Sequence, residues 1–150
     1  MPHFTVVRIH FIVRPNAVLR SASITLLAFI GVSACLGGGL LIADPSGRYL
    51  ALPTSLLSAS PFNDYLIPGI VLFVLLGGGS FLTLAAVIRN VPGAPFLMVA
   101  DGVCITTWII VQIGMIETVL PQQMIIGFIG LLLVVLGVLQ WDQQSGKSGQ

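Results

Sequence analysis

The chain has 150 residues, of which 56% are hydrophobic and 7% are charged, and its formal net charge is +1. A soluble domain carries about 25% charged residues, so this composition excludes an ordinary water-soluble protein and indicates a membrane protein. A net charge so close to zero gives no sign of a nucleic-acid partner. The two cysteines, Cys35 and Cys104, lie in apolar runs, where they are expected to pack as small hydrophobic residues without forming a disulfide.

Residues 1–16 are expected to form a cytoplasmic N-terminal segment. From Val7 to Arg14, apolar side chains largely alternate with arginine and histidine, and a period of two is typical of a half-buried strand. A lone strand is not stable in water. The segment is therefore expected to lie on the membrane surface, to pair with another segment, or to be disordered.

The first apolar run, residues 17–43, begins a transmembrane domain that is expected to extend to residue 141. The run is longer than the ~20 residues that cross a hydrocarbon core and longer than the roughly 7–15 apolar residues of a signal peptide. It therefore predicts a retained transmembrane helix. Small residues recur along it at helical spacing, at Gly31, Cys35 and Gly38, which favours close packing against another helix.

A loop rich in turn residues follows the first run. Asp44, Pro45 and Gly47 predict a turn, because an aspartate side chain can accept hydrogen bonds from the backbone ahead of it and proline presets φ. Residues 50–58 are too apolar to extend freely into water. We expect them to lie on the outer leaflet, or to cover the end of the bundle, as a short helix.

The sequence Ser60-Pro61 predicts the start of the second helix, because serine can cap free N–H groups and proline fits the first helical position. Asp64 adds negative charge where the helix dipole favours it. Asp44 and Asp64 could hold a cation together, but a turn and a cap explain both, so no metal is expected. The structural loop motif consists of Asp44, Pro45, Gly47, Ser60, Pro61, Asp64, Pro68 and Gly69.

Three further spans are expected, at residues 64–88, 95–118 and 123–141. In the second span, Gly77 to Gly79 and Ser80 again favour close helix packing, as Gly127 and Gly130 do in the fourth. Trp141 is expected at the membrane interface. Residues 142–150 are polar and are expected to form a disordered cytoplasmic tail.

The loop carries the sequence DPSG, then Leu-Pro, then SPFNDYLIPG, and the third span carries WIIVQ from Trp108 to Gln112. This pattern resembles a family of small, uncharacterised bacterial membrane proteins with four helices, over residues 24–139. The chain departs from the pattern in a longer N-terminal extension and in Asp101 within the third span. The resemblance implies a four-helix bundle in a bacterial membrane and supplies no activity, substrate or cofactor.

The third span has one polar face. Asp101, Trp108 and Gln112 share it with Ile105 and Met115, because the spacings are four, three, four and three residues. An ionised aspartate at mid-bilayer costs about 2.5–3.5 kcal/mol on insertion scales. Asp101 must therefore face the bundle, find a partner or take up a proton.

Two interpretations of this candidate functional face are open. In one, Asp101 pairs with Arg89 across the short turn and Gln112 bonds to another helix. In the other, Asp101 and Gln112 line a polar pathway or bind a polar headgroup. The sequence favours the pairing.

Basic residues set the expected orientation. In a four-span arrangement, five of the six lysines and arginines fall on one side and only Arg48 on the other; the five are Arg8, Arg14, Arg20, Arg89 and Lys147. Since cytoplasmic loops carry an excess of these residues, both termini are expected in the cytoplasm of a bacterium, with the protein in its inner (plasma) membrane.

The sequence thus predicts an all-α integral membrane bundle of four transmembrane helices. Its favoured function is that of a non-enzymatic accessory or assembly partner of a membrane complex. The alternatives are a small oligomeric carrier or channel, with the polar face lining its path, and a membrane enzyme that acts on a lipid. The expected partners are the lipid bilayer and either other membrane proteins or further copies of the chain. No cofactor is expected.

Overall fold

The structure, a computed structural model, describes residues 15–58, 60–116 and 119–145, and the side chains of residues 17–58, 60–116 and 119–143. Five α-helices and a π-helix account for most of these residues. They are α1 (Pro15–Ala43), α2 (Leu66–Ile70), the π-helix η3 (Val71–Gly78), α3 (Gly79–Ile88), α4 (Ala94–Ile116) and α5 (Pro121–Ser145). The strand-like pattern predicted before residue 15 lies outside the described residues.

Four helical spans are long and apolar enough to cross a membrane, and the prediction of an all-α membrane bundle is confirmed. The spans are Ala17–Ala43, Leu66–Ile88, Ala94–Ile116 and Pro121–Gln143. The second is continuous because α2, η3 and α3 follow one another without a break. Helix α5 continues to Ser145, so residues 142–145 are helical and not part of a disordered tail. Glutamine favours helix, and it extends α5 beyond its apolar part.

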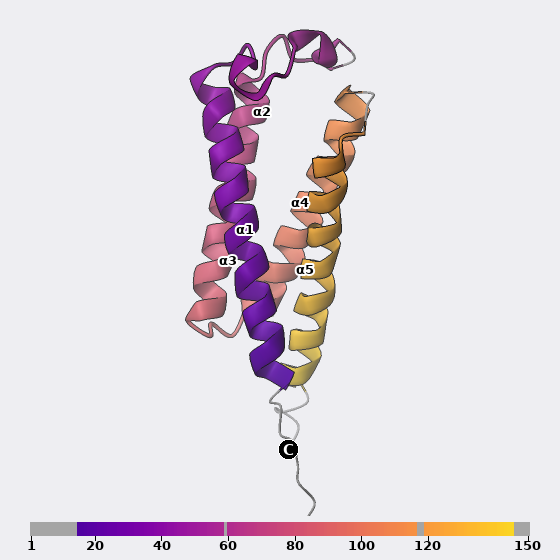
Figure 1. The fold of residues 1–150 in the computed structure, drawn as a ribbon. Coiled ribbons are helices and arrows are strands. Elements are labelled where there is room, and N and C mark those ends of the chain that lie inside the picture. Colours follow the sequence, from indigo (N-terminus) through magenta and orange to yellow (C-terminus); the bar gives the residue numbers. More distant parts are fainter. Residues whose placement is uncertain (1–14, 59, 117–118, 146–150) are drawn as a thin grey trace, which may run out of the picture.

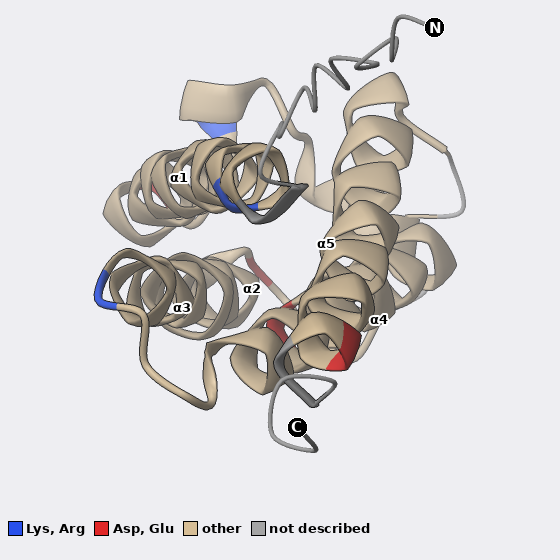
Figure 2. Ribbon diagram, turned by 90° about the horizontal axis from the view of Figure 1, so that it is seen from below, with Lys and Arg blue, Asp and Glu red and all other residues tan. Residues whose placement is uncertain are grey.

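The spans pair into two antiparallel hairpins (Figures 1 and 2). The first hairpin is α1 with α2, η3 and α3, and the second is α4 with α5. We call the end that carries residues 44–65 the loop end. The opposite end, which carries the start of α1 and the last turn of α5, is the terminal end. The hairpins lie closest near the terminal end and diverge toward the loop end (Figure 1).

Small residues bring the helices of each hairpin into backbone contact. A Cβ atom at Gly38 would lie 2.6 Å from the Phe73 nitrogen and 2.7 Å from the Gly69 carbonyl oxygen. In the second hairpin, a Cβ at Gly102 would lie 2.5 Å from the Gly130 carbonyl oxygen. Such contacts give dispersion energy to helices that gain no hydrophobic energy from one another in lipid. The predicted packing role of Gly38 and Gly130 is confirmed.

A dry core joins the two hairpins. Its fully buried members come from all four spans and include Leu27, Leu76, Met98, Ile105 and Leu133. Large apolar side chains on the outside of the spans are exposed, among them Leu36, Val74, Ile110 and Phe128. Soluble proteins rarely expose contiguous apolar surface of this extent. These faces are suited to lipid, and the chain is a multi-pass membrane protein.

The loop crosses the loop end of the bundle as two single 3₁₀ turns, η1 (Arg48–Leu50) and η2 (Thr54–Leu57). The single short helix expected over residues 50–58 is not confirmed. Ala51 takes a positive φ of 52° and Pro53 is extended, so the helical path breaks between the two turns. Leu57 is buried against Leu41, and the loop thus lies over the end of α1.

The predicted turn at Asp44 is confirmed. Its carboxylate accepts hydrogen bonds from the backbone N–H and the hydroxyl of Ser46, at 3.2 Å and 2.6 Å. The guanidinium of Arg48 pairs with the same carboxylate at 3.1 Å. Gly47 has a φ of 77°, and a Cβ there would collide with the Leu52 carbonyl oxygen and lie 2.9 Å from the Tyr65 ring. Only glycine fits this position without strain.

Tyr65 closes the loop. Its ring is buried, its N–H donates to the Pro45 carbonyl at 2.9 Å, and its hydroxyl donates to the Pro53 carbonyl at 3.1 Å. The two ends of a segment of about twenty residues are thereby held at one side chain. The DPSG and DYLIPG sequences therefore form one folded unit.

The second helix begins at Leu66, so the predicted start at Ser60-Pro61 is wrong. Ser60 instead makes a turn of its own, donating to the Leu57 carbonyl at 2.8 Å and accepting from the Phe62 N–H at 3.3 Å. Asp64 accepts a hydrogen bond from the Leu66 N–H at 3.0 Å, but the N-cap position is Tyr65 and no side chain caps the helix there. Pro68 is the third helical residue, where its missing N–H would have no partner within the helix.

Candidate functional site

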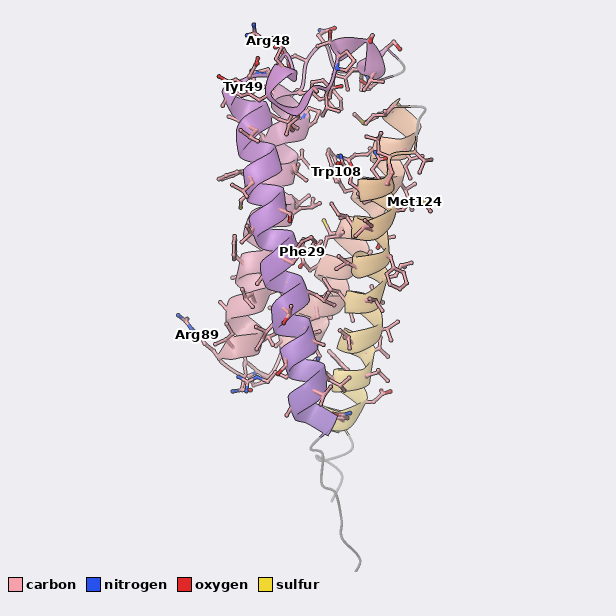
Figure 3. The ribbon with its side chains drawn as sticks, viewed as in Figure 1. Phe29, Arg48, Tyr49, Arg89, Trp108 and Met124 are labelled. Carbon is pink, nitrogen blue, oxygen red and sulfur yellow. The ribbon has the colours of Figure 1, made fainter. Side chains whose placement is uncertain are left out.

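Asp101 lies on the inner face of α4 and is bonded to the other hairpin. The Ser80 hydroxyl of α3 donates to the Asp101 carboxylate at 2.9 Å, and both residues are buried. The predicted pairing with Arg89 is wrong. Asp101 is seven residues into α4, about 10 Å from its start, whereas Arg89 is at the terminal end of α3, exposed and directed away from the bundle (Figure 3).

The polar face of α4 points into the bundle. Asp101, Ile105 and Met115 are buried, and Trp108 and Gln112 are half-buried. Trp108 is directed toward the first hairpin, while Met124 of α5 points away from it (Figure 3). The helical spacing in the sequence therefore predicted the shared face, and packing turns that face inward.

A cavity of about 50 Å³ lies at the loop end of this face. Its walls come from α1, the loop, the start of α2, α4 and the start of α5; they include Leu41, Leu57, Trp108, Gln112, Met115 and Gln123. A volume of this size holds a few water molecules or a small chemical group. Ile105, between Asp101 and Trp108 on α4, is fully buried and does not line the cavity. The cavity therefore ends above Asp101.

The cavity offers hydrogen-bond donors and carries no charge among its described lining residues. The Trp108 indole nitrogen is buried and has no hydrogen-bond partner among the described residues. Gln112 also makes no hydrogen bond within the described part of the chain. Gln123 uses its side-chain oxygen to accept from the Leu120 N–H at 2.9 Å, so its NH₂ group is a further donor. The site is suited to a neutral hydrogen-bond acceptor.

The terminal end is closed by packing and by two hydrogen bonds between elements. Gln140 of α5 donates to the Ser23 hydroxyl of α1 at 2.9 Å, and Arg20 donates to the Ile88 carbonyl at 2.8 Å. Leu27 and Met98 are fully buried between these contacts and Asp101. The Gln140–Ser23 bond joins the two hairpins, whereas the Arg20–Ile88 bond lies within the first hairpin. At the loop end, Leu41 and Leu57 pack with Met115 of α4 beside the cavity.

Outside the spans, two loop groups have shifted pKa values. The hydrogen bond from the Ser46 hydroxyl, helped by Arg48, holds the pKa of Asp44 below its ordinary value of 3.8. Burial raises the pKa of the Tyr65 phenol. Asp44 is thus occupied as a charged acceptor within the turn, and Asp64 accepts from the Leu66 N–H. Among the described residues, no three His, Cys, Asp or Glu side chains gather where they could hold a metal ion.

Three features of the site were not predicted. The sequence indicates Ser80 only as a small packing residue, Gln123 only as the start of the fourth span and Tyr65 only as part of the loop sequence. A single helix shows which of its residues share a face, but the side chain it meets depends on how the neighbouring helix is rotated. Gly77 and Gly79 were the available signal, since a Cβ atom would lie 2.5 Å from the Cys35 sulfur at the first position and 3.3 Å from the Asp101 carboxylate at the second.

The chain was compared with known proteins. No protein-family model matches it, and no curated protein or solved structure is significantly similar to it. The resemblance to small four-helix bacterial membrane proteins therefore stays a prediction.

Proposed function

We propose that this protein is a small, non-enzymatic membrane carrier that takes up a ligand from the loop end, between its two hairpins. The observation that carries this proposal is the indole N–H of Trp108 beside the cavity, which has no partner in the part of the chain that the structure describes. Leaving a buried donor without a partner costs about 1–3 kcal/mol, which a ligand that accepts from it would offset. This function corresponds to the carrier alternative from the sequence, with the site formed within one chain.

The arrangement of contacts supports a rocking motion. A hydrogen bond and the larger core cluster join the hairpins toward the terminal end, whereas at the loop end a smaller cluster, in which Met115 of α4 packs with Leu41 and Leu57, lies beside a cavity. Rotation of one hairpin about the terminal end would widen the cavity without disturbing the contacts within either hairpin. Ser80 and Asp101 are bonded across the hairpins between these regions, so their bond would sense the motion.

We place the termini in the cytoplasm and the loop end outside, in a bacterial inner membrane. Arg20 and Arg89 lie at the terminal end, and Arg48 at the loop end is paired with Asp44. The basic residues thus favour the terminal end, which the positive-inside rule assigns to the cytoplasm. A reporter that is active only in the cytoplasm should be active when fused after Gln150; activity only outside would reverse this orientation.

Cysteine labelling tests the carrier. In a Cys35→Ala, Cys104→Ala background, Gln112→Cys should react with a membrane-impermeant maleimide added at the loop side, because Gln112 lines the cavity. The matched control is Ile110→Cys on the same helix, whose side chain is 65% exposed but faces lipid. Gln112→Cys should react at least about tenfold faster, since the thiolate forms in water and not in lipid. Equal rates would contradict the carrier.

The accessory role is the second candidate. On the lipid-facing side of α4, Thr107 and Gly114 are exposed, and a Cβ at Gly114 would meet no atom within 4 Å. Small exposed residues allow another helix to approach closely. If this face binds a partner, Gly114→Leu should release a copurifying membrane protein in gentle detergent while leaving the fold of this chain intact.

A further inference from the structure

We propose that the cavity at the loop end binds the acyl ester group of a membrane lipid, with the Trp108 indole N–H donating to the ester carbonyl. The proposal rests on the carrier function and names its ligand class.

The lining chemistry selects a neutral acceptor. Trp108 has only a donor to offer, and that donor is unpaired among the described residues. Gln112 and Gln123 each present an amide NH₂ group beside it. A phosphate would need a cation, but Arg48, the described basic residue of the loop end, is bonded to Asp44 and does not line this cavity. An ester carbonyl accepts hydrogen bonds and carries no charge.

The depth also fits an ester. Helix α4 ends at Ile116, so Gln112 and Trp108 lie about 6 Å and 12 Å below its end, at 1.5 Å per residue. The hydrocarbon core is about 30 Å thick, with a polar headgroup layer of several ångströms on each side. With α4 centred in the core, its 23 residues reach about 2 Å beyond each side, so Gln112 lies about 4 Å and Trp108 about 10 Å inside the core. Lipid esters join the headgroup region to the chains at the edge of the core, so an ester would enter the cavity past Gln112 to reach the indole.

The size excludes a whole headgroup. A cavity of about 50 Å³ accommodates an ester and the first carbons of a chain, but not a phosphate and its substituent. Leu41, Leu57, Met115 and Ile116 provide apolar walls for those carbons. The lipid would thus insert its ester into the cavity while its headgroup remains outside.

The ester proposal is tested by comparing a lipid that has the ester carbonyl with one that lacks it. The protein is reconstituted with equal amounts of diacyl phosphatidylcholine and its dialkyl ether analogue, and retained lipids are counted by native mass spectrometry. The diacyl lipid should be retained about fivefold more, the ratio expected for one net hydrogen bond. Trp108→Phe keeps an aromatic ring but lacks the donor, and it should abolish the preference. Trp141→Phe removes the chain's other tryptophan and should preserve it.

Each outcome decides between the hypotheses. No preference in the native protein, as expected if only water fills the cavity, would overturn the ester proposal; so would a preference that survives Trp108→Phe. Equal thermal unfolding of Trp108→Phe and Trp141→Phe would show that a lost preference does not come from misfolding. If Gln112→Cys is labelled rapidly but the two lipids bind equally, the carrier stands and its ligand is different. If Gln112→Cys is not labelled even in protein freed of ester lipids in detergent, where no ester occupies the cavity, the carrier itself is wrong.

Discussion

The hydrogen bond from Ser80 to Asp101 joins two side chains of different hairpins inside the membrane. Ser80→Ala would leave the buried carboxylate without this donor. We expect it to lower the free energy of unfolding in detergent by about 1–3 kcal/mol, the cost of an unsatisfied buried polar group. Asp101→Asn should be milder, because the amide oxygen still accepts from Ser80 and no charge is buried.

Arg89 provides the control for this contact. Since its side chain is exposed and points away from the bundle, Arg89→Gln should leave stability nearly unchanged. In double-mutant cycles, Asp101→Ala should couple to Ser80→Ala, because each change removes the hydrogen bond, and it should not couple to Arg89→Gln. Coupling to Arg89→Gln instead would restore the ion pair that the sequence had suggested.

Asp44 makes the loop sensitive to acid. Its pKa is lowered in the folded protein, so its contribution to stability is present above the unfolded value of about 3.8 and is lost as the pH falls through the lower folded value. Thermal unfolding should therefore occur at lower temperature as the pH falls below about 4. Asp44→Asn should flatten this dependence, because an amide does not titrate in this range. An unchanged pH profile would show that the turn does not depend on the charge.

The folded loop depends on the left-handed backbone conformation of Gly47. Gly47 has a φ of 77° and contacts Leu52 and Tyr65, so Gly47→Ala adds both conformational strain and a clash. The left-handed conformation alone costs an alanine about 1–2 kcal/mol. We expect at least this loss in the free energy of unfolding. Gly93→Ala is the matched control, since a Cβ there meets no atom within 4 Å; an equal loss there would contradict the argument.

The helical spans were predictable because each is an apolar run long enough to cross a membrane, and that property needs no neighbour. The polar face of α4 was predictable for a similar reason, since it depends only on helical spacing. The start of the second helix was not. Ser60-Pro61 has the residues of a helix start, but Tyr65 is held by Pro45 and Pro53, which delays the helix to Leu66. A local signal gave way to contacts from distant residues.

The whole molecule consists of two helical hairpins that share a core and are hydrogen-bonded to each other at the terminal end. Within each hairpin, glycines allow backbone contact, whereas between hairpins the contacts are side chains, the Ser80–Asp101 bond and the Gln140–Ser23 bond. The spacing of residues along one helix does not predict whether its contacts are made by backbone or by side chains, because that depends on which other helix it packs against. The cavity at the loop end lies on this boundary between the hairpins, beside the cluster of Leu41, Leu57 and Met115.

If the hairpins rock about the terminal end, fixing that end should not close the cavity. Ser23→Cys and Gln140→Cys replace side chains that are in hydrogen-bond contact, so a short bifunctional thiol reagent should bridge them. With the bridge in place, the maleimide labelling rate of Gln112→Cys should change less than about twofold, because the cavity opens at the other end. A bridge within one hairpin serves as a control for the reagent. Loss of labelling only with the Ser23–Gln140 bridge would mean that access to the cavity requires the terminal end to open, and the motion would then need a different axis.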